Sequence, residues 1–288
     1  MSQALIQAFE QALGKAYVLT GEAIEPRYKT DWQKSATSEP LAVVRPANTE
    51  EVSAVMRLCH QHNQSVTVQG GMTGLVSGGL PEDGQVVLSM ERLNGIEEID
   101  PASSTMTVWA GTPLQVAQEA AVKADLYFAV DLGARGSCQV GGNISTNAGG
   151  NRVIRYGMMR EQILGLEVVL ADGTIVNSLN KMLKNNAGYD LKHLFIGSEG
   201  TLGIITRAVL RLHPPPGEIT TMLCAVSTYE QVVALLRRAQ SGLGNIMAFE
   251  AMWRDYFAFN AEALKLRFFT PEPPFCVIIE TTQTRGAI

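Results

Sequence analysis

The sequence predicts an α+β fold in two parts, with glycine-rich loops between its strands. Short apolar runs with strand periodicity alternate along the chain with amphipathic helical patterns. Three separate segments rich in glycine each stand beside one of the predicted strands. The Pro-rich stretch at 213–217 marks a linker, so a second and smaller part is expected after it.

The composition is that of a folded protein and narrows the range of partners. Hydrophobic residues make up 46% of the 288 residues and charged residues 18%, as in ordinary globular domains. The net charge of -5 provides no basic field to attract nucleic acid. No apolar run approaches the roughly 20 residues of a membrane span. Four scattered cysteines and the lack of signal-peptide features predict a cytoplasmic location.

The N-terminal elements follow from periodicity and capping. They are a helix over residues 4–13, an irregular polar arm over 20–40 and a strand over 41–44. Asn48 and Glu51 have the spacing of a capping box, and they begin an amphipathic helix over 49–62. His60 and His62 lie two residues apart near the end of this helix. They face different directions, which indicates solvated side chains rather than a metal pair.

The first glycine-rich loop comes directly after a predicted strand. Val66 and Val68 alternate in the strand 65–69, and Gly-Gly-Met-Thr-Gly occupies 70–74. A glycine loop in this place could bind a phosphate through its main-chain N–H groups, and a tight turn would have the same composition. The next predicted elements are strands over 86–90 and 105–109 and a helix from Thr112-Pro113 to about Ala124.

The second glycine-rich segment, residues 131–150, is the longest. Its sequence is DLGARGSCQVGGNISTNAGG, with six glycines and only two charged residues, Asp131 and Arg135. Glycine permits a left-handed backbone and the close approach of a ligand. The segment has neither the Gly-Lys-Ser/Thr ending of a P-loop nor the Gly-x-Gly-x-x-Gly that opens a Rossmann helix. It is either a ligand cradle or a long surface loop.

A third glycine-spaced segment at 196–203 runs into a predicted strand over 204–212. The elements before it are strands over 163–170 and 175–178, joined by the turn 171–174, and a helical turn over 190–195. One extended ligand threaded between two small sheets would explain all three glycine-rich loops. Arg152, Arg155 and Arg160 form either a solvated face or a rim around an anionic group.

The part after the linker is predicted to be an incomplete domain. Its elements are a strand over 219–226, a helix over 229–239, a second helix over 250–266 and a strand over 275–280. The last strand has no partner in this pattern, and an open strand edge attracts another chain. We therefore expect a half-built sheet edge at 275–280 that favours a homodimer.

Several ordered motifs resemble the PCMH-type FAD-binding domain of the vanillyl-alcohol oxidase superfamily. They are Val44-Arg45-Pro46, residues 69–74, 131–138 and 141–150, Arg155-Tyr156-Gly157, and residues 166–170, 188–191 and 197–204. Within that superfamily they are most similar to D-2-hydroxyglutarate dehydrogenases and to the related D-lactate dehydrogenases and glycolate oxidase FAD subunits. The resemblance is dense over residues 40–215 and thin after them.

The resemblance implies two α+β subdomains that clasp non-covalent FAD, followed by an α/β substrate (cap) domain with an antiparallel sheet. It divides the chain into an N-terminal helix and arm at 1–37, an FAD-binding domain at 38–215 and an incomplete substrate-binding domain at 216–288. The implied cofactor-binding residues are Gln69, Gly70, Gly71, Met72, Thr73, Gly74, Leu75, Asp131, Gly133, Ser137, Gly141, Gly142, Asn143, Ser145, Thr146, Asn147, Gly149, Gly150, Glu199, Gly203 and Ile204.

These loops have distinct implied roles. Residues 70–74 would wrap the pyrophosphate, and residues 133–150 would supply further pyrophosphate contacts and line the flavin ring. Gly203 with Ile204 would close on the adenine or ribose side. Met72 departs from the family, whose members often carry Asn there. The first loop has no His for a histidyl-flavin link, and a small packed thiol is the preferred role of Cys138 over covalent attachment.

The implied reaction is oxidation of a D-2-hydroxy acid, with transfer of the C2 hydride to flavin N5 and a separate electron acceptor. The family's substrate arginine, metal-binding histidines and catalytic histidine belong to the C-terminal half of its substrate domain. The histidines of this chain match none of those motifs, so we assign no catalytic base and no metal ligand; they are His60, His62, His193 and His213. The alternative is a non-catalytic FAD-binding fragment.

Overall fold

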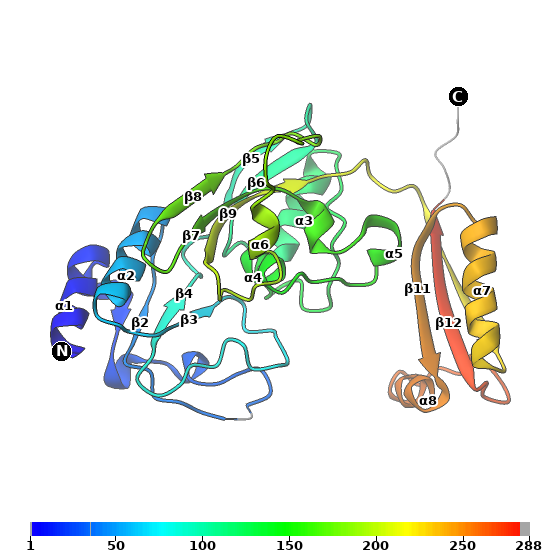
Figure 1. Ribbon diagram of the computed structural model, residues 1–288. Helices are drawn as coiled ribbons and strands as arrows, with labels where there is room; N and C mark the ends of the chain where they lie inside the picture. Colours follow the sequence, from blue (N-terminus) through cyan, green and yellow to red (C-terminus); the bar gives the residue numbers. More distant parts are fainter. Residues whose placement is uncertain (1, 35, 283–288) are drawn as a thin grey trace. The chain divides into compact units, whose positions relative to one another are not determined.

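Two units make up the part of the chain that the structure describes, residues 2–34 and 36–282 of a computed structural model (Figure 1). Unit 1 comprises Met1–Ala129, Gly133–Ala148 and Met159–His213. Unit 2 comprises Val130–Leu132, Gly149–Met158 and Pro214–Ile288. The chain therefore passes from one unit to the other several times, rather than once at the Pro-rich linker.

The first sheet of unit 1 has four strands in the order β1-β2-β4-β3. The strands are β1 (Val18–Leu19), β2 (Ala42–Val44), β3 (Val66–Gln69) and β4 (Val86–Ser89). β2, β4 and β3 run parallel, and β1 pairs antiparallel with β2. Parallel strands end at the same edge, so the glycine loop after β3 begins at the carboxyl edge of this sheet.

Two helices accompany this sheet, and the capping prediction for the second is confirmed. α1 spans Ser2–Leu13 and contacts α2, which spans Thr49–Gln61. The Asn48 side chain accepts from the Glu51 N–H at 2.8 Å. The Glu51 carboxylate in turn accepts from the N–H of Ala47 at 2.7 Å. The helix start is thus fixed by local chemistry that the sequence displays.

The irregular arm over 20–40 contributes buried side chains to unit 1. It forms the short 3₁₀ helices η2 (Gly21–Ala23) and η3 (Pro26–Tyr28) after η1 (Lys15–Tyr17). Ile24 and Tyr28 are buried against Val43 of β2 and Val87 of β4. Because these arm side chains form a small core with the sheet, the arm is a structural part of unit 1.

The second sheet of unit 1 has five antiparallel strands in the order β5-β6-β9-β7-β8. The strands are β5 (Ile96–Asp100), β6 (Thr105–Trp109), β7 (Ile163–Val169), β8 (Ile175–Ser178) and β9 (Ile204–Arg211). The predicted turn between β7 and β8 is present, with Gly173 at φ +86°. β5 was not predicted from the sequence, because the charged residues in IEEID obscure the strand pattern. It lies at the edge of the sheet.

A buried carboxylate ties α2 to the second sheet. Glu167 on β7 is 3% exposed and accepts from Thr49 at the start of α2 at 2.5 Å. It also accepts from Thr206 at 2.9 Å and from two nitrogens of Arg207 at 2.8 and 2.7 Å, both residues on β9. Burial alone would raise the pKa of Glu167, but these hydrogen bonds outweigh burial and lower the pKa.

Apart from α3, the remaining helices of unit 1 are short. They are α3 (Leu114–Lys123), α4 (Val140–Ser145), the 3₁₀ helix η4 (Met159–Gln162) and α6 (Lys192–Phe195). Pro113 occupies the N-cap of α3 instead of its first turn. Thr112 does not cap this helix, because its hydroxyl exchanges hydrogen bonds with the main chain of Gly95. In the described part of the chain, no helix is long and apolar enough to cross a membrane.

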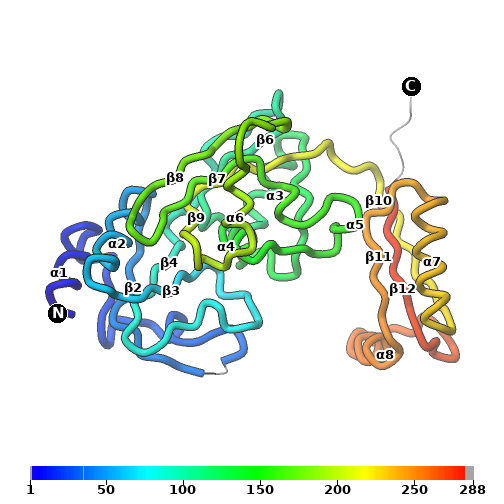
Figure 2. Tube along the Cα trace, in the orientation of Figure 1, coloured from blue at the N-terminus to red at the C-terminus, as the bar shows by residue number. Residues whose placement is uncertain are grey.

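Unit 2 contains a three-stranded antiparallel sheet in the order β10-β12-β11, visible in the trace of Figure 2. Its elements are α5 (Val153–Tyr156), β10 (Ile219–Val226), α7 (Tyr229–Gly242), β11 (Ile246–Trp253), α8 (Arg254–Ala263) and β12 (Phe275–Thr282). Val232 and Ala239 of α7 pack on Ile246, Val277 and Ile279 of the sheet. This small core fixes α7 over one face of the sheet.

Two predictions for this unit are wrong. The helix predicted over 250–266 begins only at Arg254, because the residues before it form β11 and pair with β12. β12 is consequently the central strand, with β10 on one side and β11 on the other. The half-built edge expected at 275–280 does not exist, and the argument for a homodimer through that edge fails with it.

Candidate functional site

The first two glycine-rich segments are in direct contact within unit 1. A Cβ atom on Gly71 would lie 1.9 Å from the carbonyl oxygen of Ser137. A Cβ atom on Gly70 would lie 3.2 Å from Oε1 of Gln139. Only glycine allows the main chain after β3 to approach the second segment this closely, so the contact depends on Gly71 in particular.

The third segment completes the cluster. The N–H groups of Gly197 and Glu199 donate to the carbonyls of Ile144 and Ser145, at 3.1 and 2.9 Å. The third segment also reaches the first loop, since a Cβ on Gly78 would lie 3.2 Å from Oε2 of Glu199. The three segments, far apart in sequence, therefore form one group of mutually touching loops. We call this group the loop cluster.

The loop cluster and the residues beside it hold four of the nine described non-glycine residues with positive φ. Met72, Ser77, Asn147 and Glu199 have φ values of 51, 59, 47 and 52°, in the left-handed region that residues other than glycine seldom adopt. Such conformations cost about 1–3 kcal/mol each and persist where the surroundings impose them, often at functional sites. The strain supports a functional role for the cluster.

The second segment is partly helical, although its composition suggests only a loop. Residues Val140–Ser145 form α4. Gly141 lets this helix pack closely on the end of β6, because a Cβ there would lie 2.6 Å from the Cβ of Ala110. The N–H of Gly141 also donates to the carbonyl of Ala110 at 2.7 Å. Some of the glycines that resemble a ligand motif thus serve packing.

The predicted cofactor-binding residues differ widely in exposure. The buried ones are Gln69, Gly141, Asn143, Gly203 and Ile204. Those of intermediate exposure are Gly70, Gly71, Met72, Thr73, Asp131, Ser145, Asn147 and Gly149. The exposed ones are Gly74, Leu75, Gly133, Ser137, Gly142, Thr146, Gly150 and Glu199. Gly203 has a packing role, because a Cβ there would lie 2.6 Å from Cγ1 of Val168.

Three of the predicted residues belong to unit 2 instead of unit 1. They are Asp131, Gly149 and Gly150. Asp131 and Gly150 form a parallel bridge, and Gly150 has φ +94°. A Cβ on Gly150 would lie 2.0 Å from the carbonyl oxygen of Asp131, so glycine is required for this bridge as well. The two ends of the second segment are therefore joined to each other.

The arm of unit 1 holds the first loop in place. The Ser77 hydroxyl donates to Asp31 at 2.7 Å, and the Gln33 side chain donates to the carbonyl of Leu75 at 2.9 Å. Nε2 of Gln69 donates to the carbonyls of Tyr28 and Gly79 at 3.0 and 2.8 Å. These side-chain contacts preorganise the loop without using its main-chain N–H groups.

Cys138 lies in the interior of the cluster as a packed thiol. It is 3% exposed and lies 3.5 Å from the Asn143 amide nitrogen that donates to it. Burial raises the pKa of the Cys138 thiol. A neutral and enclosed thiol is a poor nucleophile, which argues against covalent attachment of a ligand here.

The three arginines after the second segment bind protein groups. Arg160 donates to the carbonyls of His193 and Ile196, at 2.9 and 2.5 Å. In unit 2, Arg152 forms an ion pair with Glu280, and Arg155 donates to Thr282 at 2.9 Å. Their guanidinium groups are therefore not simply solvated, because they hold elements together. The interpretation as a rim around an anionic group stays a prediction.

Two of the histidines, His193 and His213, have protein groups beside their rings. His193 is largely exposed, and its Nε2 lies 3.3 Å from Asp190. Partial burial lowers the pKa of His193. Nε2 of His213 lies 2.8 Å from Oε1 of Gln162. Over residues 2–34 and 36–282, no three His, Cys, Asp or Glu side chains gather as metal ligands would.

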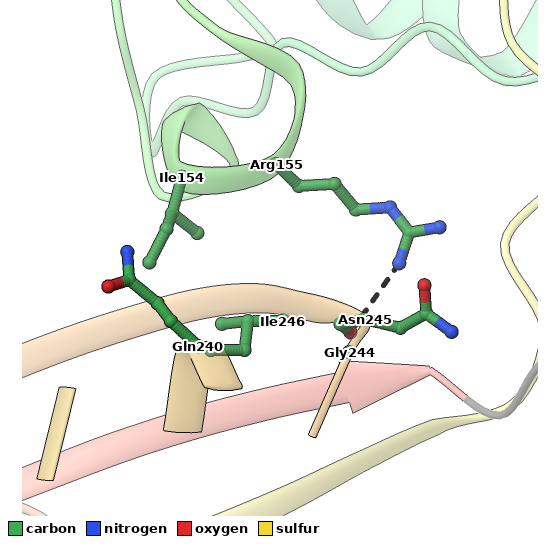
Figure 3. Close-up of a pocket in the computed structure, with 6 residues that line it drawn as sticks. All are labelled: Ile154, Arg155, Gln240, Gly244, Asn245 and Ile246. Carbon is green, nitrogen blue, oxygen red and sulfur yellow. Dashed lines mark hydrogen bonds between the residues drawn. The ribbon is translucent and has the colours of Figure 1, made fainter. Parts of the chain in front are cut away.

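Unit 2 has a separate polar hollow of about 290 Å³, shown in Figure 3. Its lining residues are Ile154, Arg155, Gln240, Gly244, Asn245 and Ile246. The guanidinium of Arg155 donates to the carbonyl of Asn245 at 3.4 Å, which is the dashed line in Figure 3. None of the residues predicted to bind a cofactor lines this hollow, and its cation already has protein partners.

Comparison with known proteins gives a match to a family model over the part of the chain that holds the first two glycine-rich segments. Residues 40–178 match the family model described as FAD binding domain. The chain is 38% identical over 277 residues to the mitochondrial D-2-hydroxyglutarate dehydrogenase of Bos taurus, with 96% of this chain and 51% of that enzyme covered. It is 43% identical over 240 residues to the D-2-hydroxyglutarate dehydrogenase of Xanthomonas citri pv. viticola, with 82% and 51% covered. The chain spans about half the length of these relatives.

Solved structures share the fold at lower identity. An alkyldihydroxyacetonephosphate synthase superposes with a TM-score of 0.83 at 19% identity, over 98% of this chain and 56% of that one. A p-cresol methylhydroxylase superposes with a TM-score of 0.76 at 17% identity, over 98% and 61%. These likenesses extend over both units.

The comparisons correct the expected cytoplasmic location. The relatives from Bos taurus, Danio rerio and Rattus norvegicus are all named as mitochondrial enzymes. Scattered cysteines predict a reducing compartment in general, and they do not distinguish the cytoplasm from others, so that prediction was wrong. The matched domain and the shared fold agree with the motifs that unit 1 brings together. Residues 40–178 therefore match an FAD binding domain, and the chain shares the fold of the solved alkyldihydroxyacetonephosphate synthase and p-cresol methylhydroxylase structures.

Proposed function

We propose that the loop cluster binds FAD non-covalently in an enzyme that oxidises a D-2-hydroxy acid of the 2-hydroxyglutarate or lactate type. The observation that carries the proposal is the mutual contact of three glycine-rich loops, with Gly71 against Ser137 and Glu199 against Ser145. The relatives named D-2-hydroxyglutarate dehydrogenase support the choice of substrate class.

The residues and domains take their roles from this proposal. Residues 38–215 are the FAD-binding domain, preceded by the helix and arm at 1–37, and residues 216–288 are an incomplete substrate-binding domain. The N–H groups of 70–74 face the pyrophosphate, because glycine-rich main chain can gather such donors around an anion. The other proposed contacts are the residues from 131 to 150 and from 199 to 204 that resemble the family's motifs.

The protein's contribution is binding and position. When bound, FAD supplies the acceptor for the hydride that leaves C2 of the hydroxy acid. The strained loops hold the site in one shape before the ligand arrives, which reduces the ordering cost of binding. The packed and protonated Cys138 thiol supports a non-covalent complex. The general base stays unassigned among the described residues.

The test is an absorbance spectrum of the purified chain supplied with FAD, followed by anaerobic addition of D-2-hydroxyglutarate and D-lactate. We expect a protein-bound flavin band, and its bleaching by one acid would identify a dehydrogenase and its substrate class. A band that stays oxidised would favour the alternative, an FAD-binding fragment without turnover. A chain that retains no flavin would overturn the whole proposal.

Two glycine variants make this test specific. Gly71→Ala should abolish flavin binding, because its Cβ would collide with the Ser137 carbonyl and separate the first two loops. Gly242→Ala is the control, since Gly242 ends α7 outside the loop cluster and a Cβ there meets nothing within 4 Å. Equal flavin content in the two variants would contradict the assignment of the site to the loop cluster.

The remaining partners follow the same proposal. The enzyme needs an electron acceptor besides the hydroxy acid. The proposed homodimer would not pair strands on β12, because β12 is paired on both sides. Sedimentation of the chain at increasing concentration measures that association directly.

A further inference from the structure

Two glutamine oxygens in the loop cluster have no hydrogen-bond partner. Oε1 of Gln69 and Oε1 of Gln139 are both buried, with no donor within reach among the residues that the structure describes. The orientation of Gln69 is fixed, because its nitrogen must face the carbonyls of Tyr28 and Gly79 to which it donates. Its oxygen therefore points away from the partners that the arm and loop supply.

Both glutamines stand at the contact between the first and second segments. Gln69 is the last residue of β3, directly before Gly70. Gln139 comes directly before α4, and its Oε1 lies 3.2 Å from the position that a Cβ on Gly70 would take. Gln139 occupies the N-cap of α4, and its side chain does not cap that helix. Neither helix capping nor the loop contacts account for the two oxygens.

Buried side-chain oxygens in folded proteins nearly always accept a hydrogen bond. An amide oxygen can accept from a hydroxyl or N–H group and has nothing to offer an anionic phosphate oxygen. A neutral donor on a bound ligand would meet this requirement. This requirement is distinct from the phosphate binding that glycine-rich main chain provides.

We propose that Gln139 and Gln69 accept hydrogen bonds from hydroxyl or N–H groups of the bound flavin nucleotide. The inference rests on the proposed function and adds Gln139, which the sequence motifs do not single out as a binding residue. The donors belong either to the flavin–ribityl half of the cofactor or to its adenosine half. Gln139 is the better probe, because Gln69 also supports the arm through Tyr28.

The experiment measures FAD affinity by quenching of flavin fluorescence in the flavin-free wild-type chain, in Gln139→Met and in Gln139→Glu. Methionine keeps the length of the side chain and removes the acceptor, so FAD should bind roughly five- to thirtyfold more weakly. Glutamate retains acceptor oxygens and cannot donate, so its FAD affinity should exceed that of the methionine variant. Gln61→Met, on the exposed end of α2, is the control and should bind as wild type does.

The outcomes separate this inference from the proposed function. A wild-type chain that binds no flavin would defeat the proposed function itself. If the wild-type chain binds FAD, two results would overturn the acceptor role alone. One is an unchanged FAD affinity in Gln139→Met, and the other is an FAD affinity of Gln139→Glu below that of Gln139→Met. Titrations with FMN and with ADP then locate the donor: the half of the cofactor whose affinity falls in Gln139→Met carries it. Thermal unfolding of the flavin-free variants checks that each one folds.

Discussion

At the scale of single residues, polar side chains decide how unit 1 holds its shape. Glu167 is the clearest case, since one buried carboxylate accepts hydrogen bonds from α2 and β9. Arg207 contacts a second carboxylate, Glu97, at 3.3 Å, where both side chains are partly exposed. The two ion pairs of Arg207 contribute differently to stability. Water screens the pair with Glu97, whereas water cannot replace the partners of the buried Glu167.

We expect Glu167→Gln to lower the free energy of unfolding at pH 7 by about 2–4 kcal/mol, since it leaves Arg207 and two hydroxyls poorly matched. The pKa of Glu167 is lowered in the folded state. Its contribution is therefore complete above the unfolded pKa and is lost as the pH falls through the folded pKa. Urea unfolding at pH 7 and at about pH 3 should show the variant and wild type converging on acidification. Glu97→Gln is the control, expected to cost under about 1 kcal/mol, and a pH-independent gap for Glu167→Gln would contradict the prediction.

At the scale of elements, two arginines join the end of the second glycine-rich segment to strand β12. In unit 2, Arg152 pairs with Glu280 on β12, and Arg155 donates to Thr282 on the same strand. Both arginines follow the end of the second glycine-rich segment, whose Gly150 is bridged to Asp131. The C-terminal sheet therefore anchors the exit of that segment through side chains, in addition to the main-chain bridge.

A double-mutant cycle tests this anchor. Arg152→Met and Glu280→Gln should each destabilise unit 2, and the double variant should lose less than the sum, with a coupling of about 1–3 kcal/mol. Hydrogen exchange of the β12 amides reports the stability of this sheet directly. Additive losses would show that the two side chains do not act as a pair.

At the scale of the whole molecule, the proposed FAD contacts are unequally divided. Most belong to unit 1, and only Asp131, Gly149 and Gly150 belong to unit 2. A ligand stabilises the part of a protein that binds it. The chain passes between the units after residues 129, 132, 148, 158 and 213.

FAD should therefore raise the melting temperature of unit 1 more than that of unit 2. At a free concentration of about 100 times its dissociation constant, the expected gain is roughly 2.7 kcal/mol for the binding unit. Scanning calorimetry with and without FAD measures the two transitions, and riboflavin, which lacks the pyrophosphate, is the control. A larger shift in the transition of unit 2 would count against the location of the site.

The sequence determined the local features of this protein. Asn48 fixes the start of α2, Gly173 fixes the β7–β8 turn, and the three glycine-rich segments mark where ordered motifs resemble a flavoprotein. Each of these depends on neighbouring residues, which a sequence displays directly. They suffice for the α+β class and for the resemblance to an FAD binding domain.

The tertiary structure decided everything that depends on distant partners. The run IMAFEAMW suits a helix or a strand equally, and it becomes β11 because β12 offers Ile279 opposite Phe249. The same pairing makes β12 central. The structural roles of Arg152 and Arg155 depend on partners more than sixty positions away in the sequence. The same holds for the burial of the Gln139 oxygen beside Gly70. Spacing along a chain does not report such contacts, because they form between elements and not within them.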